Sequence, residues 1–251
     1  TWTKVGSVAN VKLEYSTNGG STYPNTIIAS TPAAGLSYGW TIPDSVSKTL
    51  RVKISDAEDV TVYDTSDANF TIMPGFIIVA PNGGEVWTVG TAQDITWTTT
   101  GTCSNVKIEY STDGGTTYPN TIIATTPNTQ LYSWTIPDAI STSCKIKVSD
   151  VANAPAFDVS NLTFKIRGDL LLTSPNGTES WDVASHHNIT LTRTGSISFA
   201  KLEYSIDGGT TYPSLITASV DASLGTYDWL IPDSLSIQVR AKITNTADST
   251  V

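Results

Sequence analysis

The residues best able to do chemistry in this 251-residue chain are carboxylates clustered in its first third. Oxygen ligands of this kind bind Ca²⁺, which would stiffen a junction between units. Their spacing matches no defined calcium loop, and in the second repeat only Asp150 and Asp158 remain at the equivalent place, with Asn161. A solvated acidic loop is the favoured interpretation, a weak Ca²⁺ site the alternative, and no other cofactor is expected. The Ca²⁺ candidates are Asp56, Asp59, Asp64 and Asp67, and Glu58 lies among them.

Catalytic chemistry has little support in the sequence. His186 and His187 are the only histidines, and neighbouring residues on a strand point to opposite faces, so they do not easily share one metal ion. Neither has a counterpart elsewhere in the chain or a matched Ser or Cys nucleophile. We therefore expect a protein that is not an enzyme and has no catalytic residues.

Composition narrows the remaining functions. The chain carries 14 Lys and Arg against 23 Asp and Glu, a net charge of -9, which repels phosphate backbones and disfavours nucleic-acid binding. No apolar run approaches the roughly 18 residues of a membrane span, so we expect no membrane insertion. The only methionine is Met73 and no signal peptide precedes it, so we expect a processed chain or a piece of a longer one.

The chain repeats itself with a period of about 94 residues. VKLEYSTNGGSTYPNTIIASTP at residues 11–32 returns at 106–127, and more loosely at 200–220. Trp40, Trp134 and Trp229 are spaced by 94 and 95 residues. That period is the size of one immunoglobulin-like sandwich and too long for a solenoid unit. We predict three repeats: residues 1–73, which lack the first strand; 74–167, which are complete; and 168–251, which lack the last strand.

Each repeat is predicted to be a β-sandwich. Alternating apolar and polar residues, with β-branched and aromatic enrichment, mark seven strands in the middle repeat. No segment has a 3.6-residue apolar stripe, so helix should be nearly absent. The fold class is all-β: tandem seven-stranded antiparallel sandwiches arranged as beads on a string. The expected strands are residues 76–80, 94–98, 106–111, 121–125, 131–136, 144–149 and 162–166, the last with Leu162, Phe164 and Ile166 inward.

Most aromatic residues belong to the repeat. All seven tryptophans occupy repeat-equivalent positions, which favours a place in the core over a sugar-binding platform. A repeated exposed tyrosine could still bind sugar in every repeat: Tyr23, Tyr118 and Tyr212. The turn around Asp113 resembles an Asp-box hairpin, which is a structural motif even in its own family. Arg167-Gly168-Asp169 spells an integrin-type tripeptide in an expected exposed linker.

Cys103 and Cys144 are the only cysteines. Both positions are apolar in the other two repeats, and joint replacement in an exported protein suggests a disulfide. In a fibronectin-like topology, however, the two positions lie at opposite ends of the sheet, whereas a disulfide requires Cα atoms within about 7 Å. Two separate buried thiols are the alternative.

The motifs APNGGEVW, DITW, VKIEYSTDGG, WTIPD and KVSD with FDVSNLTF together resemble fibronectin type III and related immunoglobulin-like modules. They are most similar to repeats of large secreted bacterial surface proteins. They also resemble the domain of the fungal Ser-Thr-rich, GPI-anchored cell-wall family. The resemblance spans the chain and implies an extracellular, cell-surface location. The third repeat departs from the pattern, with Leu191 in place of the tryptophan at Trp97.

Two functions follow as hypotheses. The first is a structural or adhesive repeat of a long cell-surface or filament-forming protein, which fits repeats with few unique residues. Its partners would be neighbouring repeats and other copies of the chain, the latter joined by strand addition. The alternative is a carbohydrate-binding or spacer region of a secreted glycoside hydrolase or protease. Its partner would be cell-wall or extracellular polysaccharide.

Overall fold

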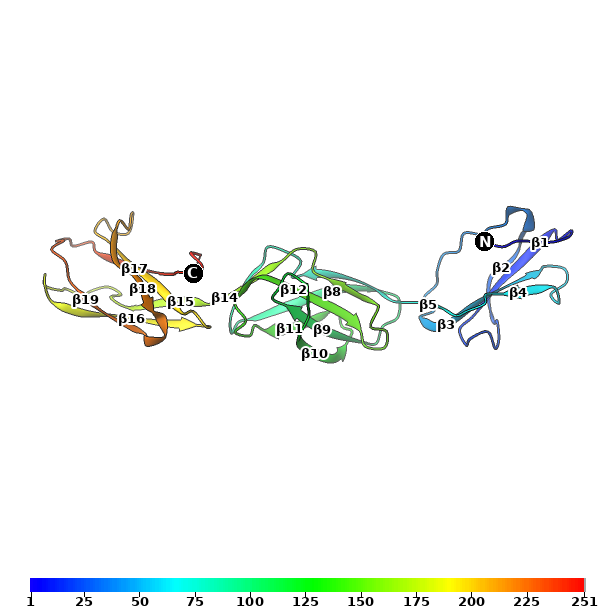
Figure 1. Ribbon diagram of the computed structural model, residues 1–251, viewed down its shortest axis with the longest axis horizontal. Helices are drawn as coiled ribbons and strands as arrows, with labels where there is room; N and C mark the ends of the chain where they lie inside the picture. Colours follow the sequence, from blue (N-terminus) through cyan, green and yellow to red (C-terminus); the bar gives the residue numbers. More distant parts are fainter. Residues whose placement is uncertain (251) are drawn as a thin grey trace.

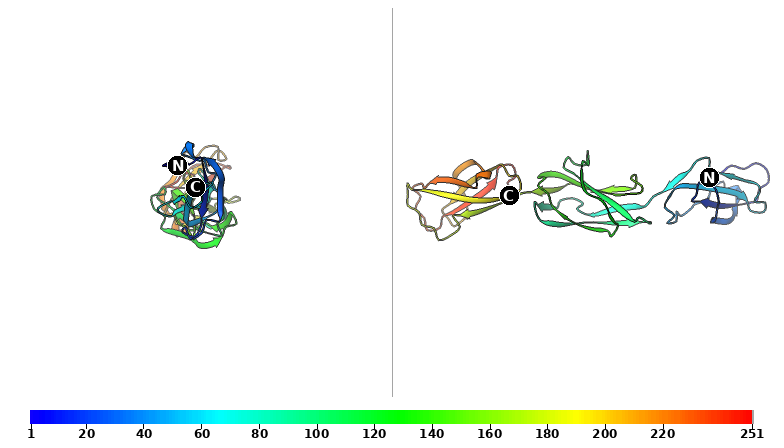
Figure 2. Two further views of the ribbon diagram at one scale, coloured as in Figure 1. Left: turned by 90° about the vertical axis from the view of Figure 1, so that its right-hand side faces the viewer. Right: turned by 90° about the horizontal axis from the view of Figure 1, so that it is seen from below.

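The computed structural model describes residues 1–250 and consists of β-strands joined by turns, with two short 3-10 turns, η1 (Ala33–Gly35) and η2 (Ala222–Leu224). Figure 1 shows three units in a row, with the N-terminus in one outer unit. The last described residues, near Thr250, lie in the other outer unit on its side towards the middle unit. Both views in Figure 2 confirm that the molecule is long and narrow. The predicted all-β class of antiparallel sandwiches is confirmed.

The middle unit is a sandwich of two sheets. One sheet has the order β11-β8-β6 and the other the order β10-β9-β12-β14-β7, with β13 paired to β12. Its strands are β6 (Gly75–Ala80), β7 (Val86–Thr88), β8 (Ala92–Thr100), β9 (Asn105–Ser111), β10 (Asn120–Pro127), β11 (Leu131–Thr135), β12 (Ser141–Asp150), β13 (Phe157–Val159) and β14 (Phe164–Arg167).

Alternate residues of these strands form the core between the two sheets. Ile95 and Trp97 of β8 face Val106 and Ile108 of β9, and each is at most 2% exposed. Because side chains alternate along a strand, this inward set is the one that the sequence pattern predicts. Burial of such residues supplies most of the favourable free energy of folding.

The structure adds to the predicted strands and corrects one residue. The short strands β7 and β13 were not expected, and β7 pairs with β14 in parallel rather than antiparallel. Leu162 was predicted to point inward but is 69% exposed. The reason is that β14 begins only at Phe164, and at Leu162 the chain still crosses the turn at Gly83.

The first unit has one sheet of order β2-β1-β3-β4, with β5 paired to β3. Its buried core is small: Tyr15, Leu50 and Ile72, with Trp40 and Phe70 partly buried beside them. The strands are β1 (Asn10–Ser16), β2 (Asn25–Pro32), β3 (Ser47–Asp56), β4 (Tyr63–Thr65) and β5 (Phe70–Ile72).

The third unit has two three-stranded sheets, β15-β16-β19 and β18-β17-β20. Leu202, Ile189 and Trp229 lie in the core between them. Its strands are β15 (Asp169–Ser174), β16 (His186–Thr194), β17 (Phe199–Ser205), β18 (Ser214–Asp221), β19 (Thr226–Leu230) and β20 (Arg240–Asn245).

Candidate functional site: the junctions between units

The two junctions contain the same polar contact, and its residues come from repeat-equivalent positions. The acceptor is the aspartate that ends the WTIPD motif, Asp44 in the first unit and Asp138 in the middle unit. The donors follow β8 and β16 in the next unit, at Thr102 and Ser196. The two acceptors are 94 residues apart, and so are the two donors, so both partners of the contact are encoded in the repeat.

At the first junction, the backbone N–H of Thr102 donates to Asp44 Oδ1 at 2.7 Å. The hydroxyl of Thr102 donates to Asp44 Oδ2, also at 2.7 Å. Each carboxylate oxygen thus accepts one charge-assisted hydrogen bond across the junction. Because these bonds favour the ionised form, they hold the pKa of Asp44 below its usual value, the hydroxyl contributing most.

At the second junction, the backbone N–H of Ser196 donates to Asp138 Oδ1 at 2.9 Å, and the Ser196 hydroxyl donates to Asp138 Oδ2. The preceding glycine makes the close approach possible. A Cβ on Gly195, whose φ is +78°, would lie 3.2 Å from Asp138 Oδ1 and 3.2 Å from a methyl carbon of Val89. We call this two-bond contact the junction clamp.

A second set of contacts lies beside each clamp. Lys48 of the first unit donates to the carbonyl of Ala152 in the middle unit at 2.6 Å. At the other junction, Lys165 pairs with Asp248, and Arg167 donates to the carbonyl of Thr250 at 2.7 Å. In both cases a basic side chain of one unit holds the loop that follows β12 or β20 in the next.

The covalent connections are short. Only Met73 and Pro74 separate β5 from β6, and only Gly168 separates β14 from β15. A Cβ on Gly168 would lie 2.5 Å from the carbonyl oxygen of Thr194 and 2.8 Å from Ile197. The integrin-type tripeptide is therefore not the exposed linker that we expected, because its glycine is packed into the third unit and its arginine lies in β14.

The clamp residues were not predicted to be functional from the sequence. The signal was present in the recurrence of an aspartate after Trp-Thr-Ile-Pro and of a glycine before Thr102 and Ser196. The third unit has the equivalent aspartate, Asp233, which is exposed and accepts no hydrogen bond within the described chain. It therefore provides an internal comparison for the clamp.

The candidate Ca²⁺ ligands lie in the first unit: Asp56 ends β3, Asp64 lies in β4, and Asp59 and Asp67 lie in the segments that follow these strands. Asp56 accepts a bond from the N–H of Glu58, and Asp59 accepts two from Thr61 at 3.1 and 2.6 Å. Asp64 accepts from the N–H of Thr65. Among residues 1–250, no three His, Cys, Asp or Glu side chains are grouped as a metal site would require. Local hydrogen bonding accounts for Asp56, Asp59 and Asp64, and Ca²⁺ binding stays a prediction.

Cys103 and Cys144 are free thiols in the structure, so the arrangement observed is the one with two separate thiols. Register explains why. Cys103 lies just before β9, next to its Asn105 end. Cys144 lies in β12 next to Lys145, which pairs with Ser111 at the other end of β9. Six residues at about 3.3 Å each place the two positions roughly 20 Å apart, well beyond disulfide reach. Burial and the nearby Asp150 carboxylate raise the pKa of Cys103 to about 11.

The candidate sugar-binding tyrosines are half-buried, and each has a lysine over its ring. The lysine nitrogen lies 6.0 Å from the ring centre of Tyr23, 5.7 Å from that of Tyr118 and 5.6 Å from that of Tyr212. In the middle unit the same nitrogen, of Lys147, also lies 4.8 Å from the ring centre of Phe157. Each of these cation–π contacts places a lysine nitrogen against one face of the tyrosine ring, a face on which a sugar could otherwise stack.

Tryptophans contribute to the cores, as the repeat pattern predicted. Trp87, Trp97, Trp134 and Trp229 are at most 7% exposed. The other three are partly buried: Trp2, Trp40 and Trp181.

The two histidines lie on β16 and do not act together. His186 Nδ1 lies 2.9 Å from Asp228 Oδ2 at the surface, whereas His187 stacks on Trp181 with ring centroids 4.5 Å apart. Their separate surroundings fit the expectation that adjacent strand residues point to opposite faces.

No protein-family model matches the chain, and no curated protein matches it. Among solved structures, it is similar to the fibronectin(III)-like modules of Clostridium thermocellum CbhA (TM-score 0.24, 15% identity, 69% of this chain and 87% of that chain). It is also similar to Dpr11 IG1 bound to DIP-gamma IG+IG2 (0.24, 10%, 68% and 96%). A third is Dpr2 Ig1-Ig2 in complex with DIP-Theta Ig1-Ig3 (0.27, 7%, 93% and 88%).

Within residues 1–250, no helix has the length and apolar character needed to cross a membrane.

Proposed function

We propose that the chain is a non-catalytic structural module of a long extracellular surface protein. It consists of three consecutive immunoglobulin-like repeats (residues 1–73, 74–167 and 168–251). Its task is to hold neighbouring repeats in a fixed orientation, so that the assembly projects away from the surface to which it is attached. The single observation that carries this proposal is the junction clamp, which recurs with the same atoms at both junctions.

The clamp suits this task because it fixes the orientation of two units and does not need to contribute a large binding free energy. Exposed charged contacts stabilise a protein by only about 0–1 kcal/mol, so one clamp would not associate free units strongly. Within one chain, a connection of one or two residues raises the effective concentration of the partners to the millimolar range or above. Under those conditions a weak directional contact is sufficient to select one orientation.

The sugar-binding alternative has no specific observation in its favour. The repeated tyrosines are the natural platform for it, and each is half-buried with a lysine nitrogen over its ring. An adhesive role, in which many such modules multiply weak contacts, is compatible with the proposal and is tested by binding assays on surfaces.

The test is small-angle X-ray scattering of the full chain and of a double variant, D44A with D138A. We expect the double variant to keep its folded cores but to show a broader distribution of interatomic distances, because the units then sample more orientations. The matched control is D233A, which removes the equivalent aspartate where no clamp is made. Equal profiles for all three proteins would contradict the proposal.

A further inference from the structure

A cavity lies beside the clamp at the second junction, between the middle and third units. Its volume of about 510 Å³ falls within the range of about 300–1,000 Å³ that is typical of small-molecule sites. We call it the junction cavity. Ser196 of the third unit lines it, together with five residues of the middle unit: Tyr110, Asn120, Asp138, Ala139 and Ile140.

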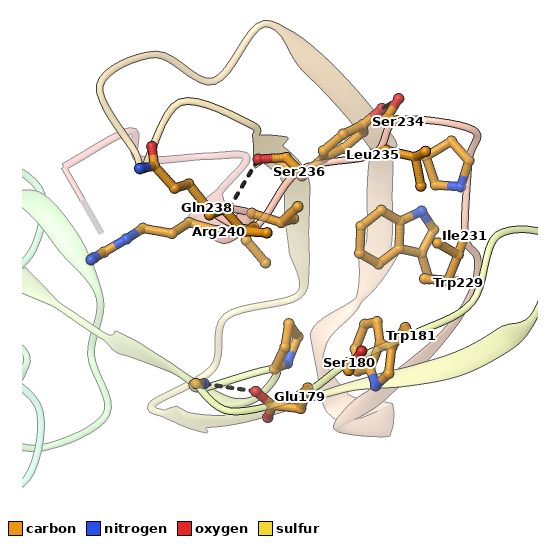
Figure 3. A pocket seen from close by; sticks show the side chains of 18 of the residues that line it. Glu179, Ser180, Trp181, Trp229, Ile231, Ser234, Leu235, Ser236, Gln238 and Arg240 are labelled. Atoms are coloured by element: carbon orange, nitrogen blue, oxygen red, sulfur yellow. Dashed lines mark hydrogen bonds between the residues drawn. The ribbon is translucent and has the colours of Figure 1, made fainter.

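In the first and third units, the tyrosine of the repeated Glu-Tyr-Ser sequence is hydrogen-bonded to the serine that directly follows the repeated Ile-Pro-Asp sequence. Tyr15 Oη lies 2.8 Å from Ser45 Oγ, and Tyr204 Oη lies 3.2 Å from Ser234 Oγ. Figure 3 shows Ser234 in the third unit, on the segment that follows Trp229. This bond gives the buried end of each tyrosine a protein partner.

The middle unit has lost this bond, because Ala139 replaces the serine. Within residues 1–250 the Tyr110 hydroxyl makes no hydrogen bond, and Tyr110 is only partly buried, whereas Tyr15 and Tyr204 are 8% and 9% exposed. A polar group in a cavity wall that has no protein partner must be satisfied by water or by a ligand. The middle unit is therefore the one whose tyrosine hydroxyl is available to a ligand.

The other polar atoms of the cavity wall are left mainly as acceptors. The Ser196 hydroxyl donates its hydrogen to Asp138 Oδ2, so Ser196 Oγ can only accept a further bond. Each Asp138 carboxylate oxygen accepts one bond in the clamp and keeps a second acceptor position. Asn120 Nδ2 donates to the carbonyl of Tyr110 at 3.4 Å, while Asn120 Oδ1 accepts no bond within the described residues. The complementary ligand group is thus a hydrogen-bond donor.

Charge and shape narrow the ligand further. Asp138 is the one charged side chain among the described residues that line the cavity, which favours a cation. Ile140 is 40% exposed, and its Cδ1 lies 3.3 Å from where a Cβ on Gly195 would be, so it presents an apolar surface at the junction. Ca²⁺ takes about six to eight oxygen ligands, and one carboxylate is a poor basis for such a site. A primary ammonium has three N–H donors and no acceptor, and it can carry an aliphatic stem.

We propose that the junction cavity binds a primary alkylammonium group, carried by a small amine or by a lysine side chain of a partner protein. The ammonium donates to the Asp138 carboxylate, to Ser196 Oγ and to the Tyr110 hydroxyl, and its methylene stem lies against Ile140. Because the ligand contacts both units, it stiffens the second junction. That consequence rests on the proposed function, whereas the binding itself does not.

The test is a titration of the isotope-labelled full chain with n-butylamine hydrochloride, followed through backbone amide chemical shifts. We expect saturable shifts in the millimolar range, confined to residues 110–112, 120, 138–141 and 195–197. One exposed ion pair strengthens binding by at most roughly fivefold, so saturation in this range requires the other groups of the cavity. The control ligand is 1-butanol, which has the same stem without the charge. The internal control is Asp233, whose amides should show no saturation.

Two variants make the site specific. A139S gives Tyr110 the serine partner that Tyr15 and Tyr204 have, and should weaken binding by about tenfold, the effect of losing one hydrogen bond to a charged group. Y110F removes the hydroxyl alone and should weaken binding several-fold. Serine occupies this position in both other units, so A139S is compatible with the fold. Unchanged amide shifts in β8 and β14 show that each variant is folded.

A second ligand, Nα-acetyl-lysine methylamide, distinguishes the two sources. Binding at least as tight as that of butylamine identifies a lysine side chain as the ligand, and weaker binding identifies a small amine; both outcomes support the site. No saturation at millimolar butylamine, equal binding of 1-butanol, or undiminished binding by A139S would overturn the proposal. Equal scattering profiles for the wild type and the D44A and D138A double variant would refute the proposed function instead, because the titration reports local contacts and not the orientation of the units.

Discussion

Replacing Phe164 with alanine should destabilise the middle unit strongly, because this side chain connects β14 to the core. Phe164 is 1% exposed, and its ring centre lies 4.9 Å from that of Trp87. Loss of the transfer free energy costs about 1.5–3 kcal/mol, and the cavity left behind raises the total to about 3–5 kcal/mol. A unit of this size has roughly 5–14 kcal/mol of stability, so the change is a large fraction of the whole.

The assay has to isolate the middle unit, since unfolding of three units is not a single two-state transition. Native-state hydrogen exchange resolves it: amides of β8, β9 and β12 report its opening free energy. The matched control is L162A, two residues earlier and 69% exposed, which should cost less than about 0.5 kcal/mol. Similar costs for the two variants, or a cost below about 1 kcal/mol for F164A, would refute the assignment of Phe164 as the core residue of this strand.

Three further outcomes follow from the site geometry. Alkylation after denaturation without reductant should modify both Cys103 and Cys144, and a disulfide-linked peptide would contradict this. In the native state at pH 8, Cys103 should react with a thiol reagent roughly a hundred times more slowly than an unperturbed cysteine, because its pKa is raised to about 11. Hydrogen bonds from Ser111 and Thr117 lower the pKa of Asp113 in the folded chain. The stability that ionised Asp113 contributes is therefore present above its unfolded pKa of about 4 and is lost as the pH falls. D113N should reduce the acid sensitivity of hydrogen exchange in the β9–β10 turn, and an unchanged pH profile would refute this prediction. G168A should destabilise the junction between β14 and β15 by about 1–3 kcal/mol, since the added Cβ would meet the backbone oxygen of Thr194. Amide hydrogen exchange in β15 of the variant that equals that of the wild type would count against this packing.

Periodicity predicted most of the fold. Alternation along 106–111 and 144–149 placed Ile108, Ile146 and Val148 in the core, where all three are fully buried. The prediction failed at Leu162 because alternation holds only once a strand has begun, and the turn over Gly83 delays β14 until Phe164. The strands β7 and β13 were missed because three residues are too few for a periodic signal.

The candidate site was harder to predict because its residues carry no unusual chemistry. Asp44 and Thr102 are ordinary surface types, and only their recurrence at Asp138 and Ser196 distinguishes them. Which aspartate meets which hydroxyl depends on how successive units are oriented, and local sequence does not encode that directly.

The most direct test of the account is the orientation of the three units in solution, measured by residual dipolar couplings of backbone amides in the full chain. We predict that one alignment tensor fits the amides of all three units, because the clamps and the one- and two-residue connections hold them as one body. Three separate tensors with different magnitudes would mean that the units reorient independently, and would contradict a structural role for the junctions.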